Sequence, residues 1–123
     1  MTARILFNVA ALLEGLTGIV ILFAPAFAIG LLLGDGLSQT GTVVARVLGI
    51  GLLSLGVSTW ENARTQAKPA TRIGICIYNF GTAVVLGMSG TMGEMSGVIL
   101  WPGVGLHGLI GATMLWVILR PSR

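Results

Sequence analysis

The chain has 123 residues, of which 54% are hydrophobic and 9% are charged, and its formal net charge is +3. Soluble domains carry about 25% charged residues, so this composition argues against a water-soluble globular protein. The basic residues form no stripe with interleaved aromatic side chains, which argues against nucleic acid as a partner.

The first apolar run covers residues 5–24. A helix of about 20 residues is long enough to cross the hydrocarbon core of a bilayer, because each residue adds about 1.5 Å to its length. Arg4, this run and the small residues Ala26 and Ala28 after it also resemble a secretory signal peptide. Glu14 is an unusual occupant of a signal-peptide core, so we expect a retained transmembrane helix.

Pro25 predicts a break or a kink directly after this first run, because proline removes a backbone hydrogen-bond donor. Residues 26–33 are too few to cross the membrane again. We expect them to form a short helix at the outer membrane interface, which ends at the turn-forming residues 34–36. A single longer, bent helix is the alternative.

Three more apolar runs cover residues 42–60, 71–89 and 97–119. The polar residues 61–70 are expected to form a loop or an interfacial turn. Since lipid offers the backbone no hydrogen-bond partners, each run is expected to be an α-helix. The prediction is therefore a single all-α domain over residues 1–123, an integral membrane bundle of four transmembrane helices with a short interfacial helix after the first.

Basic residues lie almost entirely on one side of this topology. The side that holds the N-terminal segment, the segment between the second and third runs and the C-terminal segment carries six of the seven: Arg4, Arg64, Lys68, Arg72 at the start of the third run, Arg120 and Arg123. Only Arg46, near the start of the second run, falls on the other side. Lys and Arg are enriched in the cytoplasmic segments of membrane proteins, so we predict that both termini face the cytoplasm.

The 19 glycines of the chain recur at helical spacings within the apolar runs. In lipid, small residues allow two helix backbones to approach closely, which favours helix association. The residues expected to form such faces are Gly15 and Gly18 in the first run, Gly49 and Gly56 in the second, and Gly103, Gly108 and Gly111 in the fourth. We expect tight packing within the bundle or between subunits, and a glycine-lined ligand channel is the alternative.

Five polar side chains stand out within the apolar runs: Glu14, Arg46, Tyr78, Asn79 and His107. An acidic residue near the middle of a bilayer costs on the order of 2.5–3.5 kcal/mol, so Glu14 is expected to face the bundle interior, to be paired or to be protonated. By the rise of a helix, it can meet Tyr78 or Asn79. His107 leans outward, toward Arg46 or external water, and a Glu14–Arg46 pair is not expected.

Two interpretations of these polar residues stay open. They form an interhelical hydrogen-bond network that sets helix register, in which each bond contributes roughly 0.6 kcal/mol, or they line a pocket or relay that binds a small molecule or carries protons. With one histidine and one cysteine, no metal site and no cofactor are expected from this chain alone. The sequence contains no Walker, paired-histidine or Gly-x-Ser-x-Gly motif, so no enzymatic activity is predicted.

Several short segments resemble small four-helix inner-membrane proteins of bacteria, loosely of the DoxX-like type: residues 13–18, 45–49, 77–79 and 100–102, together with His107. The resemblance implies a location in the bacterial inner membrane. From some members of that group, it also implies an accessory role in membrane redox complexes that work with quinones. The chain lacks a pair of cysteines, which argues against a thiol-based role.

The leading functional prediction is a non-enzymatic membrane bundle that associates with itself or joins a larger membrane complex. Its buried polar residues either set the packing or line a pocket for a lipid- or quinone-like molecule. The alternatives are a minimal proton-coupled transporter or channel that uses Glu14, and an accessory subunit of a membrane redox complex. The expected partners are the lipid bilayer, further subunits and a lipid or quinone ligand.

Overall fold

The computed structural model describes residues 2–65 and 69–119, and these residues form five helices and no strand. The helices are α1 (Thr2–Phe23), α2 (Pro25–Leu33), α3 (Gln39–Thr65), α4 (Pro69–Thr91) and α5 (Leu100–Leu119). All except α2 are long and apolar enough to cross a membrane. The predicted all-α bundle of four membrane-spanning helices is therefore confirmed.

The short helix after the first span is confirmed as a separate element. Ala24 interrupts the helical backbone with φ −130° and ψ 57°, and Pro25 then starts α2. Proline suits the first turn of a helix because its missing N–H needs no intrahelical partner there. α2 ends at Gly34, whose φ of 80° is left-handed and whose N–H donates to the Gly30 carbonyl at 2.9 Å.

Two helix boundaries correct the prediction. α3 continues through residues 61–65, where the polar sequence predicts a loop. Hydropathy marks where a chain leaves lipid, but a helix can continue into water beyond that point. α5 begins at Leu100 rather than at residue 97, because the preceding residues bond to α2: the Ile99 N–H donates to the Leu31 carbonyl at 3.1 Å.

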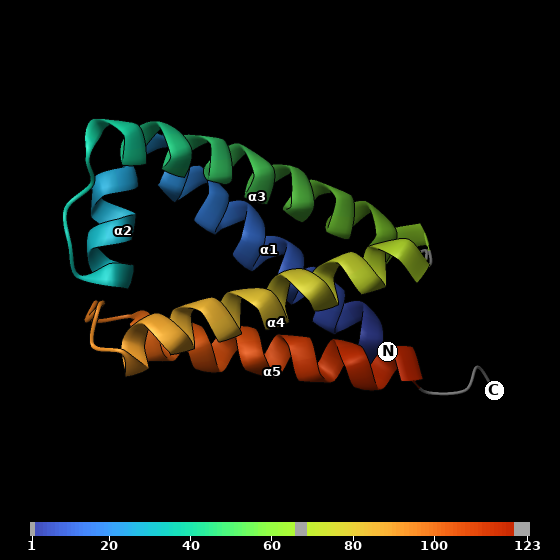
Figure 1. Cartoon of the computed structure of the whole chain (residues 1–123). Helices are drawn as coiled ribbons and strands as arrows, with labels where there is room; N and C mark the ends of the chain where they lie inside the picture. The colour runs from blue at the N-terminus through green and yellow to red at the C-terminus, as the bar shows by residue number, and fades with distance from the viewer. Residues whose placement is uncertain (1, 66–68, 120–123) are drawn as a thin grey trace.

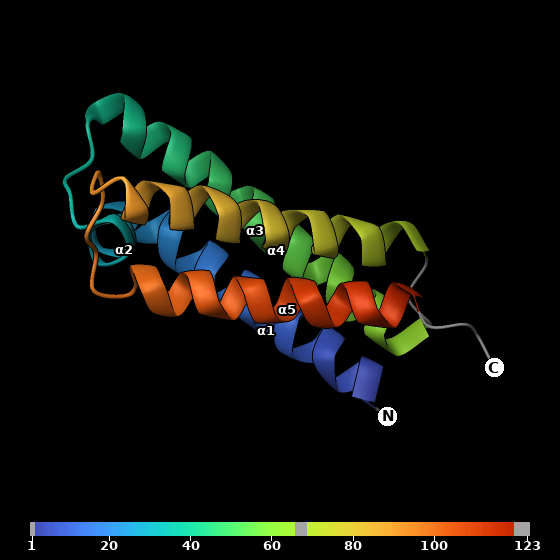
Figure 2. The same ribbon diagram turned by 60° about the horizontal axis from the view of Figure 1, so that its bottom comes forward.

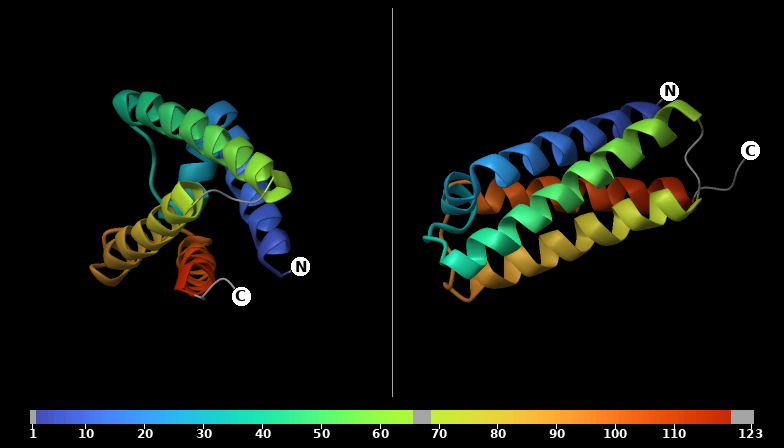
Figure 3. Two further views of the ribbon diagram at one scale, coloured as in Figure 1. Left: turned by 90° about the vertical axis from the view of Figure 1, so that its right-hand side faces the viewer. Right: turned by 90° about the horizontal axis from the view of Figure 1, so that it is seen from above.

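The four long helices are arranged as two pairs, α1 with α3 and α4 with α5 (Figure 1). The end-on view in Figure 3 separates these pairs, and Figure 2 shows α4 and α5 running side by side. α1 begins and α5 ends at one end of the bundle, whereas α2 lies at the opposite end (Figure 1). This up-and-down order places both ends of the described chain on the same side, as four spans require.

The α1–α3 pair is held by direct contact between backbones. A Cβ atom added to Gly18 would lie 2.7 Å from the Gly49 carbonyl oxygen, and one added to Gly56 would lie 2.7 Å from the Gly15 nitrogen. Such separations leave no room for a side chain. These four glycines therefore lie where the two helices approach most closely, which is the packing that small residues permit in lipid.

The α4–α5 pair is filled by side chains instead. Gly111 faces the Phe80 ring, which would lie 3.1 Å from an added Cβ, and the Cys76 thiol donates to the Gly111 carbonyl at 3.8 Å. Gly103 approaches Leu32 of α2, and Gly108 has open space on its Cβ side. The three predicted glycines of α5 therefore do not share one tight interface.

The apolar core consists of two clusters along the bundle. One contains Phe7, Ala10, Ile75, Cys76, Ile110 and Met114, from α1, α4 and α5. The other contains Ile21, Ala45 and Leu52, from α1 and α3, with Tyr78 of α4 packed against it. On α1, Glu14 lies between the residues of the first cluster and Ile21 of the second. A polar layer thus separates the two apolar ones.

Candidate functional site

Glu14 and Asn79 form the centre of this polar layer. Glu14 lies near the middle of α1 and is 2% exposed, and Asn79 of α4 is fully buried. The Asn79 amide nitrogen Nδ2 donates to Glu14 Oε1 at 3.4 Å and to the Ile75 carbonyl oxygen at 3.0 Å. These hydrogen bonds lower the cost that the two polar side chains incur at membrane depth.

His107 joins the layer from α5. Its ring atom Nδ1 lies 2.8 Å from the Asn79 side-chain oxygen Oδ1. The ring also makes an edge contact with Tyr78, with centroids 5.7 Å apart and planes at 83°. An edge-on arrangement is favoured between aromatic rings because the positive edge of one faces the negative face of the other. One hydrogen bond and one ring contact therefore fix the orientation of the imidazole.

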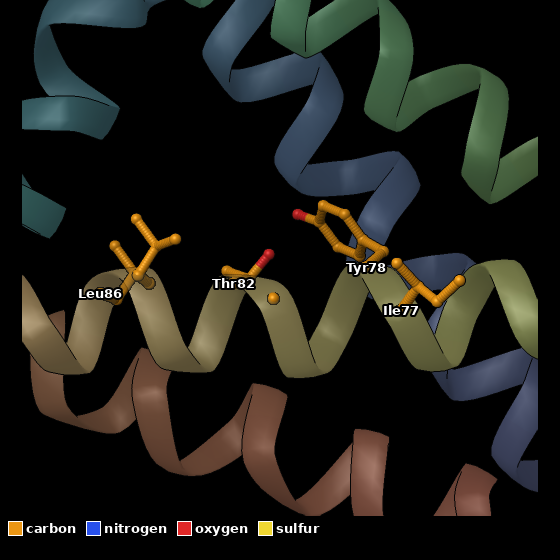
Figure 4. A pocket seen from close by; sticks show the side chains of 6 residues that line it. Ile77, Tyr78, Thr82 and Leu86 are labelled. Atoms are coloured by element: carbon orange, nitrogen blue, oxygen red, sulfur yellow. The ribbon is translucent and has the colours of Figure 1, made fainter.

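Tyr78 connects the layer to a first pocket, on the surface of α4. Its side chain interacts with the Glu14 carboxyl group and with Thr82. Tyr78 and Thr82 extend toward the side of α4 on which α1 lies (Figure 4). With Ile77 and Leu86 they line a pocket of about 370 Å³.

A second pocket, of about 420 Å³, lies between α1, α2 and α5. Most of its lining is apolar, and the lining includes Ile21, Ala28, Leu32 and Leu106. Its polar side chains are His107 and Thr17. We call it the α1–α2–α5 pocket. An apolar cavity with a few placed polar groups is the usual form of a small-molecule binding site.

The segment before α5 holds α2 beside this pocket. The Ser96 N–H donates to the Leu33 carbonyl at 3.0 Å, and the Ile99 N–H donates to the Leu31 carbonyl at 3.1 Å. Both bonds satisfy carbonyls at the C-terminal end of α2 that have no partner within the helix. Between them Gly97 is buried, and a Cβ atom there would overlap the Leu32 carbonyl group. Only glycine allows this approach.

Arg46 lies apart from the other four predicted polar residues. It is exposed on α3, and within the described part of the chain no hydrogen bond or ion pair joins it to Glu14 or His107. The neighbouring Ala45 is buried and faces the core, so the next residue along the helix points elsewhere. The expectation that His107 reaches toward Arg46 is therefore corrected, since its protein partner is Asn79.

Sequence reasoning did not single out Thr17, Thr82 and Gly97. Threonines in these helices commonly bond to a carbonyl one turn earlier, as Thr59 does to Leu55 and Thr113 to Leu109, each at 2.7 Å. Nothing in the sequence separates such self-bonded threonines from pocket-lining ones. In the sequence, Gly97 stands at the start of the fourth apolar run, and its role depends on a contact with a distant segment.

The site offers hydrogen bonding and shape rather than an evident reactive group. Its polar groups are one carboxyl, one amide, one imidazole, one phenol and the threonine hydroxyls. Among the residues that the structure describes, His, Cys, Asp and Glu side chains form no group of three that could hold a metal ion. The arrangement is suited to orienting a polar head group at the edge of an apolar cavity.

Comparison with known proteins identifies no relative of this chain. No protein-family model, no curated protein and no solved structure matches it. Function is therefore argued from the geometry and chemistry of the site itself, because a helical bundle alone does not specify an activity.

Proposed function

We propose that this protein binds an amphiphile, a lipid- or quinone-like molecule, in the α1–α2–α5 pocket. The observation that carries the proposal is the position of His107, which lines an apolar cavity of about 420 Å³ while a fully buried Asn79 holds its ring. A bound tail would contact Ile21, Ala28 and Leu106, and a bound head group would meet His107 and Thr17.

The cost of polar groups at membrane depth supports this proposal. A polar atom without a partner in an apolar environment costs several kcal/mol, about 2–7 depending on the reference state. The Asn79 bond satisfies one of the two His107 ring nitrogens, and the described residues provide no partner for the other. A ligand with a polar head would supply that partner.

The cellular setting is proposed from charge and from exposed small residues. The bacterial inner membrane is the location that the DoxX-like resemblance implies. We place both termini in the cytoplasm because basic residues concentrate on that side of the chain. Gly105 and Ala112 are exposed on α5, and Gly108 on the same helix has open space beside it. This face is suited to a second subunit or to a partner in a membrane complex, and the DoxX-like resemblance remains a prediction.

Native mass spectrometry of the detergent-extracted protein tests the binding proposal. Ala28→Leu fills part of the α1–α2–α5 pocket, whereas Ala26→Leu places the same side chain on α2 at an exposed position outside the pocket lining. We expect wild type and Ala26→Leu to retain a lipid-like molecule and Ala28→Leu to lose most of it. Equal retention by the two variants, or an empty wild-type protein after incubation with membrane lipids, would contradict the proposal.

A proton-coupled carrier is the second candidate, and the position of Glu14 supports it. Glu14 interacts with Tyr78, which lines the α4 pocket, and through Asn79 with His107, which lines the other pocket. Chains of Glu, Asp and His side chains within membrane spans are common elements of proton relays. A carrier predicts that Glu14→Gln abolishes proton flux in liposomes, and unchanged flux would exclude this role for the residue.

A further inference from the structure

The orientation of the Asn79 side chain follows from its partners. One end of the amide lies 3.0 Å from the Ile75 carbonyl oxygen, which can only accept a hydrogen bond. That end must therefore be the NH₂ group, because the reverse orientation would place two oxygens against each other. The same NH₂ group faces Glu14 Oε1. The Asn79 oxygen is then the atom that faces His107.

The tautomer of His107 follows from that oxygen. Asn79 Oδ1 is an acceptor, so the Nδ1 atom 2.8 Å away must carry a proton and donate it. A neutral imidazole has one protonated and one unprotonated nitrogen. With the proton on Nδ1, the other nitrogen, Nε2, carries a lone pair and acts as a hydrogen-bond acceptor.

The Nε2 atom is the part of the ring that is available to a ligand. Within the residues that the structure describes, no hydrogen bond to this nitrogen is formed. His107 lines the α1–α2–α5 pocket and is partly exposed. The polar contact that this ring offers to the pocket is therefore an acceptor.

We infer that the head group bound in the α1–α2–α5 pocket is a neutral hydroxyl that donates a hydrogen bond to His107 Nε2. The inference rests on the proposed function and specifies its ligand class: an alkylphenol, a hydroquinone or a long-chain alcohol. A quinone carbonyl or an ether presents only lone pairs to Nε2. A deprotonated, anionic head group likewise has no proton to donate to the Nε2 lone pair.

The Thr17 hydroxyl strengthens the assignment. Thr17 is one of the pocket-lining residues of α1, and a hydroxyl can donate or accept. A ligand hydroxyl that donates to Nε2 keeps its own lone pairs free to accept from such a donor. An ether or carbonyl oxygen can accept a hydrogen bond from Thr17 but cannot donate one to Nε2. Discrimination between ligands with a hydroxyl group and ligands with only an ether or a carbonyl group therefore depends on His107.

Two probes that differ only in the donor test this inference: 4-nonylphenol and its methyl ether, 4-nonylanisole. Binding of each to the detergent-solubilised full chain is measured by native mass spectrometry over a range of probe concentrations. We expect the phenol to bind about tenfold more tightly, since one net hydrogen bond contributes about 1 kcal/mol and an unpaired acceptor adds to the difference. Equal affinities, or tighter binding of the ether, would overturn the inference.

Variants then locate the origin of the preference. His107→Phe keeps a ring of similar shape but removes Nε2. Both probes should then bind this variant with about equal affinity. A phenol preference that persists in His107→Phe would also overturn the inference. The wild-type comparison needs no variant, so a folding defect in His107→Phe leaves the test decisive. Failure of both probes to bind wild type would instead count against the proposed function.

Discussion

The two sides of α1 are packed in opposite ways. Toward α3, the two backbones touch at Gly15 and Gly18, and neither Gly18 of α1 nor Gly56 of α3 has space for a side chain. Toward α2 and α5, Thr17 and Ile21 border a cavity of about 420 Å³. The comparison shows that a small bundle can keep a cavity when another face of the same helix is packed tightly, because the tight face prevents α1 from shifting into the cavity.

The largest effect is expected from substitution in the tight α1–α3 contact. In Gly49→Leu, even the first added atom would lie 2.7 Å from the Leu22 nitrogen, and backbone cannot move aside as a side chain can. We expect a loss of unfolding free energy of about 3 kcal/mol or more, beyond the usual range for overpacking. Gly51→Leu, at an exposed site with open space, is the matched control. Thermal unfolding in detergent measures both, and equal stability would contradict the described contact.

A smaller effect is expected where α2 meets the segment before α5. Gly97→Ala places a methyl group against the Leu32 carbonyl and should push α2 away from the bonds donated by Ser96 and Ile99. We expect a loss of about 1–3 kcal/mol and weaker retention of a ligand in the α1–α2–α5 pocket. Gly36→Ala, in a turn with open space, provides the control. If Gly97→Ala retains as much ligand as Gly36→Ala, the contact between Gly97 and α2 does not maintain the α1–α2–α5 pocket.

Substitution in the polar layer is expected to weaken the contact of α1 with α4 and α5. Asn79→Leu is similar in size but removes the partner of His107 and leaves the Glu14 carboxyl without its amide. We expect destabilisation of about 1–3 kcal/mol, the usual cost of buried polar groups that lose a partner. Asn8→Leu, at a half-buried site of α1 outside the layer, makes the same chemical change. If the two variants unfold at the same temperature, the layer contributes no stability.

The smallest effect is expected in the pocket on α4. Thr82→Val keeps the side-chain shape and removes the hydroxyl that interacts with Tyr78. We expect a change of roughly 0.6 kcal/mol, the mean value for polar contacts within membranes. Thr113→Val removes a hydroxyl that bonds only to its own helix, at Leu109, and serves as the reference. An effect of Thr82→Val as large as that of Asn79→Leu would contradict the central role of Asn79 and favour Tyr78 and the pocket on the surface of α4.

The four spans could be predicted from the sequence because hydropathy depends only on local composition. The break at Pro25 has an equally local cause, and the resulting α2 is confirmed. The helical rise also predicted that Glu14 lies at a depth where it can meet Asn79, and the two side chains are hydrogen-bonded. Each of these predictions uses local composition or depth along a helix and needs no knowledge of how the helices are rotated.

The rest could not be predicted because it depends on helix rotation and on contacts between distant segments. Depth places Arg46 within the bundle, but rotation of α3 turns it outward while Ala45 faces the core. The hydrogen bonds of residues 96–99 to the end of α2 join segments about 65 positions apart. Hydropathy gives no indication of this contact. The α1–α2–α5 pocket depends on the same pairing and has no local signature.

The most direct test of this account measures the protonation of the His107 ring. His107 is the only histidine in the chain, so its two ring nitrogens can be assigned in ¹⁵N NMR spectra of the labelled protein in lipid without any variant. The account predicts a protonated Nδ1 and an unprotonated Nε2 in the ligand-free protein at neutral pH. A spectrum with the proton on Nε2 would contradict both the hydrogen bond to Asn79 and the acceptor that His107 presents to the pocket.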